Sequence, residues 1–364
     1  MKSVLRRFAY LLALLGLFFL LWPSPVDPLA WRPPEAPPLA GVAAPNDLLQ
    51  SAERLAEGLV VGPENVVPDA EGRIYAGLED GRIVRMLPGA LAAETFADTG
   101  GRPLGLEFDA AGNLVVCDAV KGLLRVDPAG KVEVLASEAG GAPFRFTDDL
   151  AIARDGRIYF SDASSKWGPD SYLHDLLEAR PHGRLLRYDP ATRQTEVLLP
   201  ELYFANGVAL SQAEDFVLVN ETYRYRITRL WLTGERAGRT DVFAENLPGI
   251  PDGISSNGRG TFWVAMYTVR NAQADALHPS PFMKRQLAKM PRAFWPKPQR
   301  QGMVFAFDEE GRLLRTFQDA GGEKVPHVTA VEERDGWLYL GNLHENYLSR
   351  YRLPISQSAT RKPR

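Results

Sequence analysis

The stretch FANGVALSQAEDFVLVNETYRYRITRLWL, residues 204–232, holds the pattern that decides the fold. It contains a short strand with period-2 patterning, a polar turn, a second such strand and another turn, which together are typical of β-hairpins. Related units begin at five further places, near residues 68, 108, 152, 255 and 332. Their spacing of roughly 40 to 75 residues fits radial blades of about four strands each. The sequence therefore predicts an all-β fold, a six-bladed β-propeller.

One position of the repeat, the residue eight before each turn, carries the functional prediction. In chain order the six residues at this position are Glu64, Leu104, Asp148, Asn206, Asp252 and Val328. The innermost strand of each blade lines the central channel, so equivalent positions converge at one end of it. Three carboxylates and one amide oxygen would repel one another there, and a hard divalent cation would remove the conflict. We expect calcium (Ca2+) held by Glu64, Asp148, Asn206 and Asp252; alternatively, these side chains face water at the channel mouth.

Composition narrows the class of protein further. With 364 residues and 45% hydrophobic content, the chain can bury a large core. A net charge of -3 and a pI of about 6.0 provide no basic field, so we expect no nucleic-acid partner. The one cysteine, Cys117, lies in the apolar run LVVCD and is predicted to be a buried strand residue.

Residues 1–22 form a separate amino-terminal segment. Lys2, Arg6 and Arg7 precede an uncharged apolar run from Phe8 to Trp22. As a helix the run would span only about 22 Å, so it is either an uncleaved signal anchor or a cleaved signal peptide. Trp22 and the lack of an A-x-A site after the run favour a single-pass membrane-anchor helix. The basic flank would remain cytoplasmic and place the propeller on the extracytoplasmic side, in a periplasm or lumen.

The remaining boundaries follow from composition. Residues 23–50 begin with eight prolines up to Pro45 and are predicted to be an extended spacer that holds the body away from the membrane. The propeller is expected over 51–355, followed by a basic tail over 356–364.

An insertion over 270–300 interrupts the fifth blade. It carries seven Lys or Arg against one Asp, with apolar and aromatic residues between them. Its middle, from Phe282 to Met290, is predicted to form a short amphipathic helix. Three interpretations stay open for the insertion: a lid over the channel mouth, an element that contacts acidic lipid headgroups, or a solvated segment without a role.

Four motifs resemble a known family: GPE at 62–64, YFSDASSKW at 159–167, FANGVALS with FVLVNET, and LPGIPDGI with FWVAM. They are similar to the strictosidine synthase-like branch of the calcium-dependent six-bladed propellers, a superfamily that also contains gluconolactonases, paraoxonases and diisopropylfluorophosphatase. Within this branch, the anchor and the insertion are most similar to the adipocyte plasma membrane-associated protein type. The resemblance extends over about residues 55–353. It implies metal ligands at Glu64, Asn206 and Asp252, and a fourth at Asp148, where most members carry Asn.

Two departures from the family pattern bear on the chemistry. Leu104 occupies the position of the catalytic histidine of paraoxonase-like members, and Pro326 that of the catalytic glutamate of true synthases. Strictosidine synthase activity itself is therefore not expected. The resemblance instead implies a lactonase-like arrangement, in which calcium polarises an ester or lactone carbonyl and orients a water. Asp252 would be the general base, and His327, beside the sixth-blade position, either borders the pocket or is structural.

The sequence is therefore compatible with two functions. The first is a calcium-dependent hydrolase of small-molecule esters or lactones, like an arylesterase or lactonase. The second is a non-catalytic propeller that binds or scaffolds a partner and whose calcium is structural. The other histidines suggest no zinc site. His344 is interpreted as structural or surface-exposed, His174 and His182 lie in a blade-three loop that forms a pocket rim in relatives, and His278 lies in the insertion.

Overall fold

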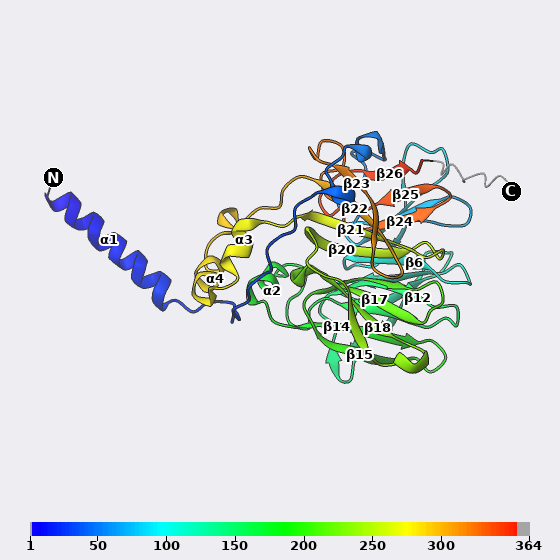
Figure 1. Cartoon of the computed structure of the whole chain (residues 1–364), viewed down its shortest axis with the longest axis horizontal. Helices are drawn as coiled ribbons and strands as arrows, with labels where there is room; N and C mark the ends of the chain where they lie inside the picture. The colour runs from blue at the N-terminus through cyan, green and yellow to red at the C-terminus, as the bar shows by residue number, and fades with distance from the viewer. Residues whose placement is uncertain (1, 355–364) are drawn as a thin grey trace.

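The computed structural model describes residues 2–354, so the predicted basic tail, 356–364, lies outside the described residues. Within them, six four-stranded antiparallel sheets form the blades of a propeller, which confirms the predicted all-β fold (Figure 1). The first strand of each of the first five sheets, and β24 in the sixth, is innermost, and most inner strands contact those of neighbouring blades.

The strand bounds follow the repeat. Blades one to three are β2 (Val66–Pro68), β3 (Ile74–Gly77), β4 (Arg82–Met86) and β5 (Glu94–Asp98); β6 (Pro103–Phe108), β7 (Leu114–Asp118), β8 (Gly122–Val126) and β9 (Val132–Ala136); β12 (Thr147–Ile152), β13 (Ile158–Asp162), β14 (Gly183–Asp189) and β15 (Gln194–Leu202). Blades four and five are β16 (Ala205–Leu210), β17 (Phe216–Glu221), β18 (Arg226–Trp231) and β19 (Thr240–Ala244); β20 (Gly249–Ser256), β21 (Thr261–Val269), β22 (Gly302–Asp308) and β23 (Leu313–Asp319). Blade six is β24 (Val331–Arg334), β25 (Trp337–Leu340), β26 (Leu348–Arg352) and β1 (Glu53–Leu55), and a small hairpin pairs β10 (Glu138–Ala139) with β11 (Ala142–Pro143).

The ring closes through its two ends. β1 pairs antiparallel with β26, so a strand from the start of the propeller completes the blade formed by its end. This closure leaves no blade with a missing outer strand, and it ties the amino-terminal segment to the last strand.

The strand β17 shows how successive residues of one strand pack into two different cores. Phe216 and Leu218 pack toward blade five, whereas Val217 and Val219 pack toward blade three. Both faces of the strand are buried because each blade is packed between two others, and an apolar residue is therefore favoured at every position. Cys117 in β7 is fully buried for the same reason, as predicted.

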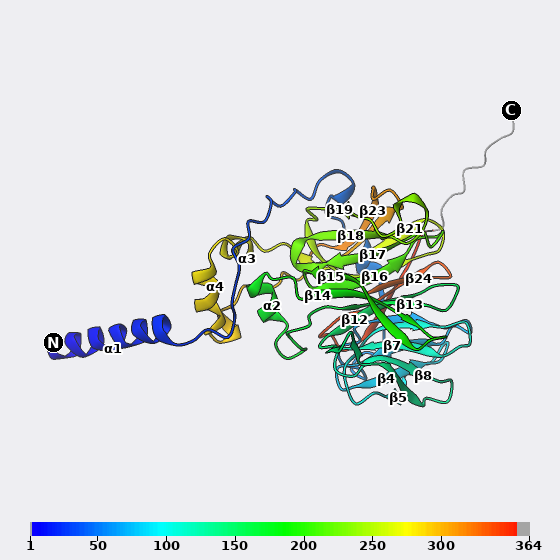
Figure 2. The ribbon, with the colours of Figure 1, turned by 90° about the horizontal axis from the view of Figure 1, so that it is seen from below.

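All the regular helices except α1 (Lys2–Leu21) lie at one end of the described propeller (Figures 1 and 2). These are α2 (Leu173–Glu178) in the blade-three loop, and α3 (Ala272–Leu277) and α4 (Pro281–Ala288) in the insertion. α4 confirms the amphipathic helix predicted for the insertion, and Ser280 caps it by accepting from Met283 N. α3 and α2 were not predicted. α1 extends away from the body on the same side, and its segment from Ser3 to Leu21 is long and apolar enough to cross a membrane.

The proline-rich segment is extended, but it packs along the body where a free spacer was expected. Val26 and Pro28 are buried. Further on, Asn246 Nδ2 donates to the Glu35 carbonyl at 3.0 Å, and Arg270 Nη2 donates to the Pro34 carbonyl at 2.6 Å. The eight prolines of the segment lack backbone donors, but its carbonyls accept from the body. The short 3-10 helices η1 (Gly41–Ala43) and η2 (Leu48–Ser51) then lead into β1.

Candidate active site

The inner strands bring the predicted site residues to one cavity. Asp148 and Asn206 are each the second residue of their strand, Asp252 lies near the start of β20, and Glu64 lies just before β2. All four line a cavity of about 770 Å³, together with Leu104. Val328, the sixth residue of the register, is fully buried and packs in the core between blades five and six. The register thus places five of its six residues on the cavity wall.

One direct hydrogen bond joins two of the four predicted ligands. Asn206 Nδ2 donates to Asp252 Oδ1 at 2.5 Å, which leaves the Asn206 carbonyl oxygen available to a cation. The backbone around them is also fixed, because Asn220 Nδ2 donates to the Asp252 carbonyl at 2.6 Å and Thr329 Oγ1 donates to the Glu64 carbonyl at 2.6 Å. These two bonds hold the backbone at Asp252 and at Glu64 to neighbouring strands.

The electrostatics of the four side chains fit a divalent cation. Burial, and then the charge of Asp252, raises the pKa of Glu64 well above its usual range, and Arg102 opposes this only in part. Burial and the charge of Glu64 likewise raise the pKa of Asp148, and burial raises the pKa of Asp252 to about 7. Buried carboxylates in this position favour a cation among them, and all-oxygen donors suit calcium. No three Asp, Glu, His or Cys side chains between residues 2 and 354 are close enough to hold a metal by themselves, so the site stays a prediction.

Two glycines next to the predicted ligands allow the inner strands to approach one another. A Cβ on Gly207 would lie 2.4 Å from Ile254 N, and a Cβ on Gly253 would lie 2.7 Å from Thr329 O. Any larger residue would push neighbouring blades apart at the level of the site. The dipeptides Asn206-Gly207 and Asp252-Gly253 carry this signal in the sequence.

Asp149 is a further residue that sequence reasoning missed. It occupies in blade three the position that glycine holds in blades four and five. Its Oδ1 accepts from Leu150 N at 2.9 Å and its Oδ2 from Val208 N at 3.1 Å, and the Ile254 amide also bonds to it. Burial raises the pKa of Asp149 to about 7. The residue joins the inner strands of three blades directly behind the site.

Above the polar residues the cavity wall is mainly apolar and aromatic. The side chains that form this part of the wall come from several blades: Phe146, Tyr172, Phe204, Tyr223, Ile250 and Tyr267. The rings pack on one another, since the centroids of Phe204 and Tyr223 are 4.6 Å apart and those of Phe146 and Phe204 are 5.5 Å apart. A cavity of this volume, in which an aromatic wall adjoins convergent polar groups, is typical of small-molecule sites.

His327 lies on the cavity wall, as one of its two interpretations required. Its Nδ1 is 3.0 Å from the Tyr267 carbonyl, and the two rings stack with centroids 4.8 Å apart. Burial lowers the pKa of His327, so the neutral ring donates through Nδ1 and leaves Nε2 free. His344 also lines the cavity, although the sequence suggested a structural or surface role. The cavity is not lined by His174 or His182 among the described residues.

The insertion covers the cavity, which supports the lid among its three interpretations. Its residues on the cavity wall are Asn271, Ala274, Leu277, His278, Lys284, Leu287, Trp295, Pro296, Lys297, Pro298 and Arg300. α2 adds Leu173, Leu176 and Leu177. The opposite face of the insertion exposes Phe282, Met283 and Phe294. The lid is therefore a helical layer with one face in the cavity and one face in solvent.

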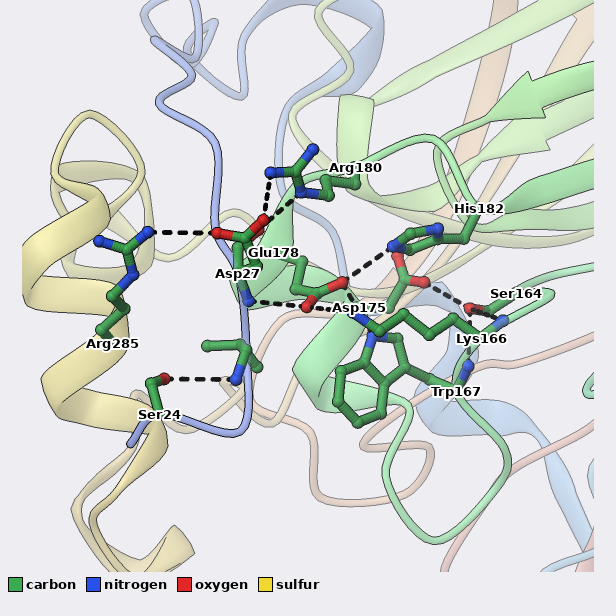
Figure 3. Close-up of polar contacts among 11 residues, drawn as sticks. Ser24, Asp27, Ser164, Lys166, Trp167, Asp175, Glu178, Arg180, His182 and Arg285 are labelled. Atoms are coloured by element: carbon green, nitrogen blue, oxygen red, sulfur yellow. Dashed lines mark hydrogen bonds and ion pairs between the residues drawn. The ribbon is translucent and has the colours of Figure 1, made fainter. Parts of the chain in front are cut away.

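Residues 24–31, which we call the strap, bind this lid from outside (Figure 3). Val26 is 4% exposed and packs with Leu177, Ala288 and Trp295, and so bridges α2 and the insertion. Asp27 accepts from Arg180 Nη2 at 2.6 Å and from Arg285 Nη2 at 3.2 Å. The strap thus joins the segment that follows α1 to both parts of the lid.

Glu178 is the centre of the polar contacts under the strap. Its Oε1 accepts from Asp27 N at 2.8 Å and from Lys166 Nζ at 2.6 Å, and its Oε2 lies 2.8 Å from His182 Nε2 and 3.2 Å from Trp167 Nε1 (Figure 3). These partners lower the pKa of Glu178 to about 2 against the opposing effect of burial. The carboxylate therefore stays charged and holds the strap to the blade-three loop.

Comparison with known proteins agrees with this architecture. Residues 148–235 match the strictosidine synthase family and residues 41–86 match the strictosidine synthase-like amino-terminal region. The chain is 40% identical to adipocyte plasma membrane-associated protein of Mus musculus, over 93% of this chain and 87% of the relative. It is 36% identical to the protein strictosidine synthase-like 10 of Arabidopsis thaliana, over 86% of this chain and 93% of the relative.

Solved structures share the fold at lower identity. A gluconolactonase of Xanthomonas campestris superposes with a TM-score of 0.61 at 20% identity, covering 91% of this chain and 98% of that one. A luciferin-regenerating enzyme superposes with a TM-score of 0.59 at 14% identity, covering 84% and 95%. The calcium-binding protein regucalcin of Agrobacterium tumefaciens superposes with a TM-score of 0.57 at 13% identity, covering 82% and 92%.

Proposed function

The chain belongs to the strictosidine synthase-like family of six-bladed propellers, and we propose that it is a calcium-dependent hydrolase of small-molecule esters or lactones. One observation carries the proposal: four oxygen-bearing side chains and an aromatic wall meet in one cavity under a helical lid. The neighbours described as a gluconolactonase and as a calcium-binding protein support this choice of chemistry. Strictosidine synthase chemistry is not proposed, because Pro326 stands where the synthases carry their glutamate.

Calcium would be held by Glu64, Asp148, Asn206 and Asp252, and when bound it would polarise the carbonyl of the substrate. Asp252 acts as general base for the attacking water, since its carboxylate lines the cavity beside the other three proposed ligands. The Asn206 amide, 2.5 Å away, orients its carboxylate.

The rest of the cavity binds and shields the substrate. The aromatic wall takes the apolar body of an ester or lactone, and the lid shields the bound substrate from bulk solvent while the cavity keeps room for the one water that attacks the carbonyl. His327 is fixed by the Tyr267 carbonyl and offers Nε2 as a hydrogen-bonding group or as a second proton carrier.

Cleavage of a panel of aryl esters and lactones by the purified full chain tests the proposal. We expect cleavage that depends on calcium and falls at least about 100-fold in Asp252→Asn. Asp241→Asn, which changes a surface ion pair with Arg229, is the matched control and should keep full activity. Absence of calcium-dependent cleavage across the panel, or activity unchanged in Asp252→Asn, would refute the hydrolase.

A separate measurement tests the metal itself. Glu64→Gln should lower the calcium content of the purified protein, and a chelator should lower the thermal midpoint of the wild type. If neither quantity changes, the ligand assignment is wrong. Calcium binding without cleavage would instead support the second candidate, a propeller with structural calcium that binds a partner. Leu104, which lines the cavity where paraoxonase-like members carry a histidine, favours this candidate.

The membrane association follows from the amino terminus and the relatives. The Mus musculus relative is named a plasma membrane-associated protein, and α1 is apolar enough to cross a bilayer. We propose a single-pass anchor with the propeller on the extracytoplasmic side, rather than a cleaved signal peptide. Carbonate extraction of membranes and amino-terminal sequencing check this: recovery of a soluble chain that begins after Trp22 would contradict it.

A further inference from the structure

Lys284 is a buried cation on the cavity wall that lacks an anionic partner. Its side chain is fully buried in α4 and lines the cavity. Nζ donates to the Leu29 carbonyl at 2.5 Å, and no ion pair joins Lys284 to another residue of the described chain. An ammonium group carries three donors, so donors remain for a further acceptor. Burial, followed by the charge of Arg224, lowers the pKa of Lys284 to about 8.

His278 lies beside Lys284 with both ring nitrogens unpartnered. It is 2% exposed, it lines the cavity, and neither Nδ1 nor Nε2 has a hydrogen-bond partner within residues 2–354. The Trp31 ring of the strap packs against it, with centroids 4.9 Å apart. Burial and the charge of Lys284 lower the pKa of His278 to about 3, so the ring is neutral and offers one donor and one acceptor.

The nearby carboxylate does not neutralise Lys284. Glu178 is already bonded to Lys166, His182 and Trp167, and it also accepts from the strap. The other charged neighbour of Lys284, Arg224, is also positive. A buried charge without a counterion is unfavourable, and buried polar groups are normally hydrogen-bonded. Two such groups side by side on a cavity wall therefore point to a ligand.

We propose that Lys284 and His278 form a subsite at the lid end of the cavity for the anionic group, a carboxylate or phosphate, of an amphipathic ligand. The apolar body of this ligand lies between Leu177, Leu287 and Trp295, which line the same cavity. If the chain is the proposed hydrolase, the subsite specifies its substrate class: an ester or lactone that also carries a negative charge away from the reacting carbonyl. This statement about the substrate rests on the proposed function. Binding of the anion by itself does not depend on turnover.

The competing interpretation is that Lys284 only fastens the strap through the Leu29 carbonyl. A fastening role would affect every ligand of the cavity equally, because it would act on the lid as a whole. An anion subsite would affect charged ligands alone. A pair of probes that differ only in charge separates the two roles.

The test is calorimetric binding of 4-phenylbutyrate and its neutral counterpart 4-phenylbutan-1-ol to the full chain in a non-ionic detergent, with a chelator present. The chelator removes calcium, so the carboxylate has no cation to bind among the register residues. We expect the wild type to prefer the acid, and Lys284→Met to weaken the acid about 10- to 100-fold while the alcohol changes less than about threefold. Phenylbutyl phosphate in a third arm shows whether phosphate is accepted as well as carboxylate.

Lys289→Met is the matched control from the end of the same helix. Lys289 Nζ donates to the Phe19 carbonyl and to Gln286 Oε1, and Lys289 is outside the cavity wall formed by the described residues. Both probes should bind this variant as they bind the wild type. Equal loss of acid and alcohol in Lys284→Met would assign the residue to the strap and overturn the proposal. If Lys284→Met does not fold, the wild type still decides, because equal affinity for the two probes overturns the subsite. Since no arm measures cleavage, failure of the hydrolase and failure of the subsite are distinguishable.

Discussion

Glu178→Gln is the substitution that tests most directly how the strap is held to the lid. The side chain of Glu178 is fully buried, and its two oxygens have four partners, two of which, Lys166 and His182, can be positively charged (Figure 3). Glutamine keeps the size of the side chain and removes the charge. The substitution therefore isolates the electrostatic contribution from the packing.

The magnitude follows from the pKa. The pKa of Glu178 falls from 4.5 to about 2 on folding, and each unit corresponds to about 1.4 kcal/mol, so the charged form contributes about 3 kcal/mol to the free energy of unfolding. Because the folded pKa is the lower one, the contribution is present above about pH 4.5 and is lost as the pH falls toward 2. We expect Glu178→Gln to be destabilised by about this amount at pH 7, and the difference from wild type to narrow below pH 4.5.

Thermal unfolding of the full chain in detergent, followed between pH 7 and pH 3, measures this difference. A loss of about 3 kcal/mol corresponds to roughly 5 °C or more in the midpoint for a domain of this size. Glu196→Gln is the control: Glu196 is exposed and pairs with Arg187 at 2.6 Å, so its loss should cost less than about 1 kcal/mol. A shift in Glu178→Gln no larger than that of the control, or a shift that does not change with pH, would refute the reasoning.

Two more substitutions test the inner strands and the strap. Gly207→Ala should lower the thermal midpoint, because the new Cβ would lie 2.4 Å from Ile254 N. The rise of the midpoint on adding calcium should also become smaller. The control is Gly168→Ala, whose new Cβ would have its nearest contact at 3.6 Å and should change neither quantity. Val26→Asp places a charge in the buried contact with the lid, and should speed proteolysis within residues 23–31 and cost about 2–3 kcal/mol. Val42→Asp, at a site 53% exposed in the same segment, should cost less than about 0.5 kcal/mol, and equal proteolysis of the two variants would contradict the buried contact.

The propeller and the register could be predicted because both follow from a local period. Each blade packs between two others, so alternate residues of a strand such as β17 enter two different cores, and the pattern is visible in the sequence itself. Once the repeat is aligned, symmetry alone places Glu64, Asp148, Asn206 and Asp252 at one end of the channel. In the same alignment Asp149 occupies the repeat position that glycine holds in blades four and five, but only the structure shows that its carboxylate joins three inner strands.

The strap could not be predicted, and the lid was only one of three interpretations of the insertion, because both depend on contacts between segments distant in the chain. Asp27 and Glu178 are separated by 151 residues, and Lys284 and Leu29 by 255. No period relates such pairs, and a proline-rich sequence is compatible with both a free spacer and a segment packed on a surface. His278 and Lys284 illustrate the consequence: in the sequence they are two of many polar residues in a basic insertion, and only their shared burial on a cavity wall distinguishes them.

The strap residues that contact the lid all lie after α1 in the chain. The first of these contacts is at Val26, four residues after the apolar run ends at Trp22. The contacts of Val26, Asp27, Leu29 and Trp31 with the lid therefore do not require α1, and a chain that lacked α1 would keep the cavity roof and the Leu29 carbonyl that binds Lys284. Besides the contact of the Phe19 carbonyl with Lys289, α1 adds location: it extends from the side of the molecule where the lid lies (Figure 1), so a bilayer that held α1 would face the lid rather than the far end of the propeller. The amphipathic substrate proposed above, if it came from that bilayer, would then approach the protein from the side where the lid lies.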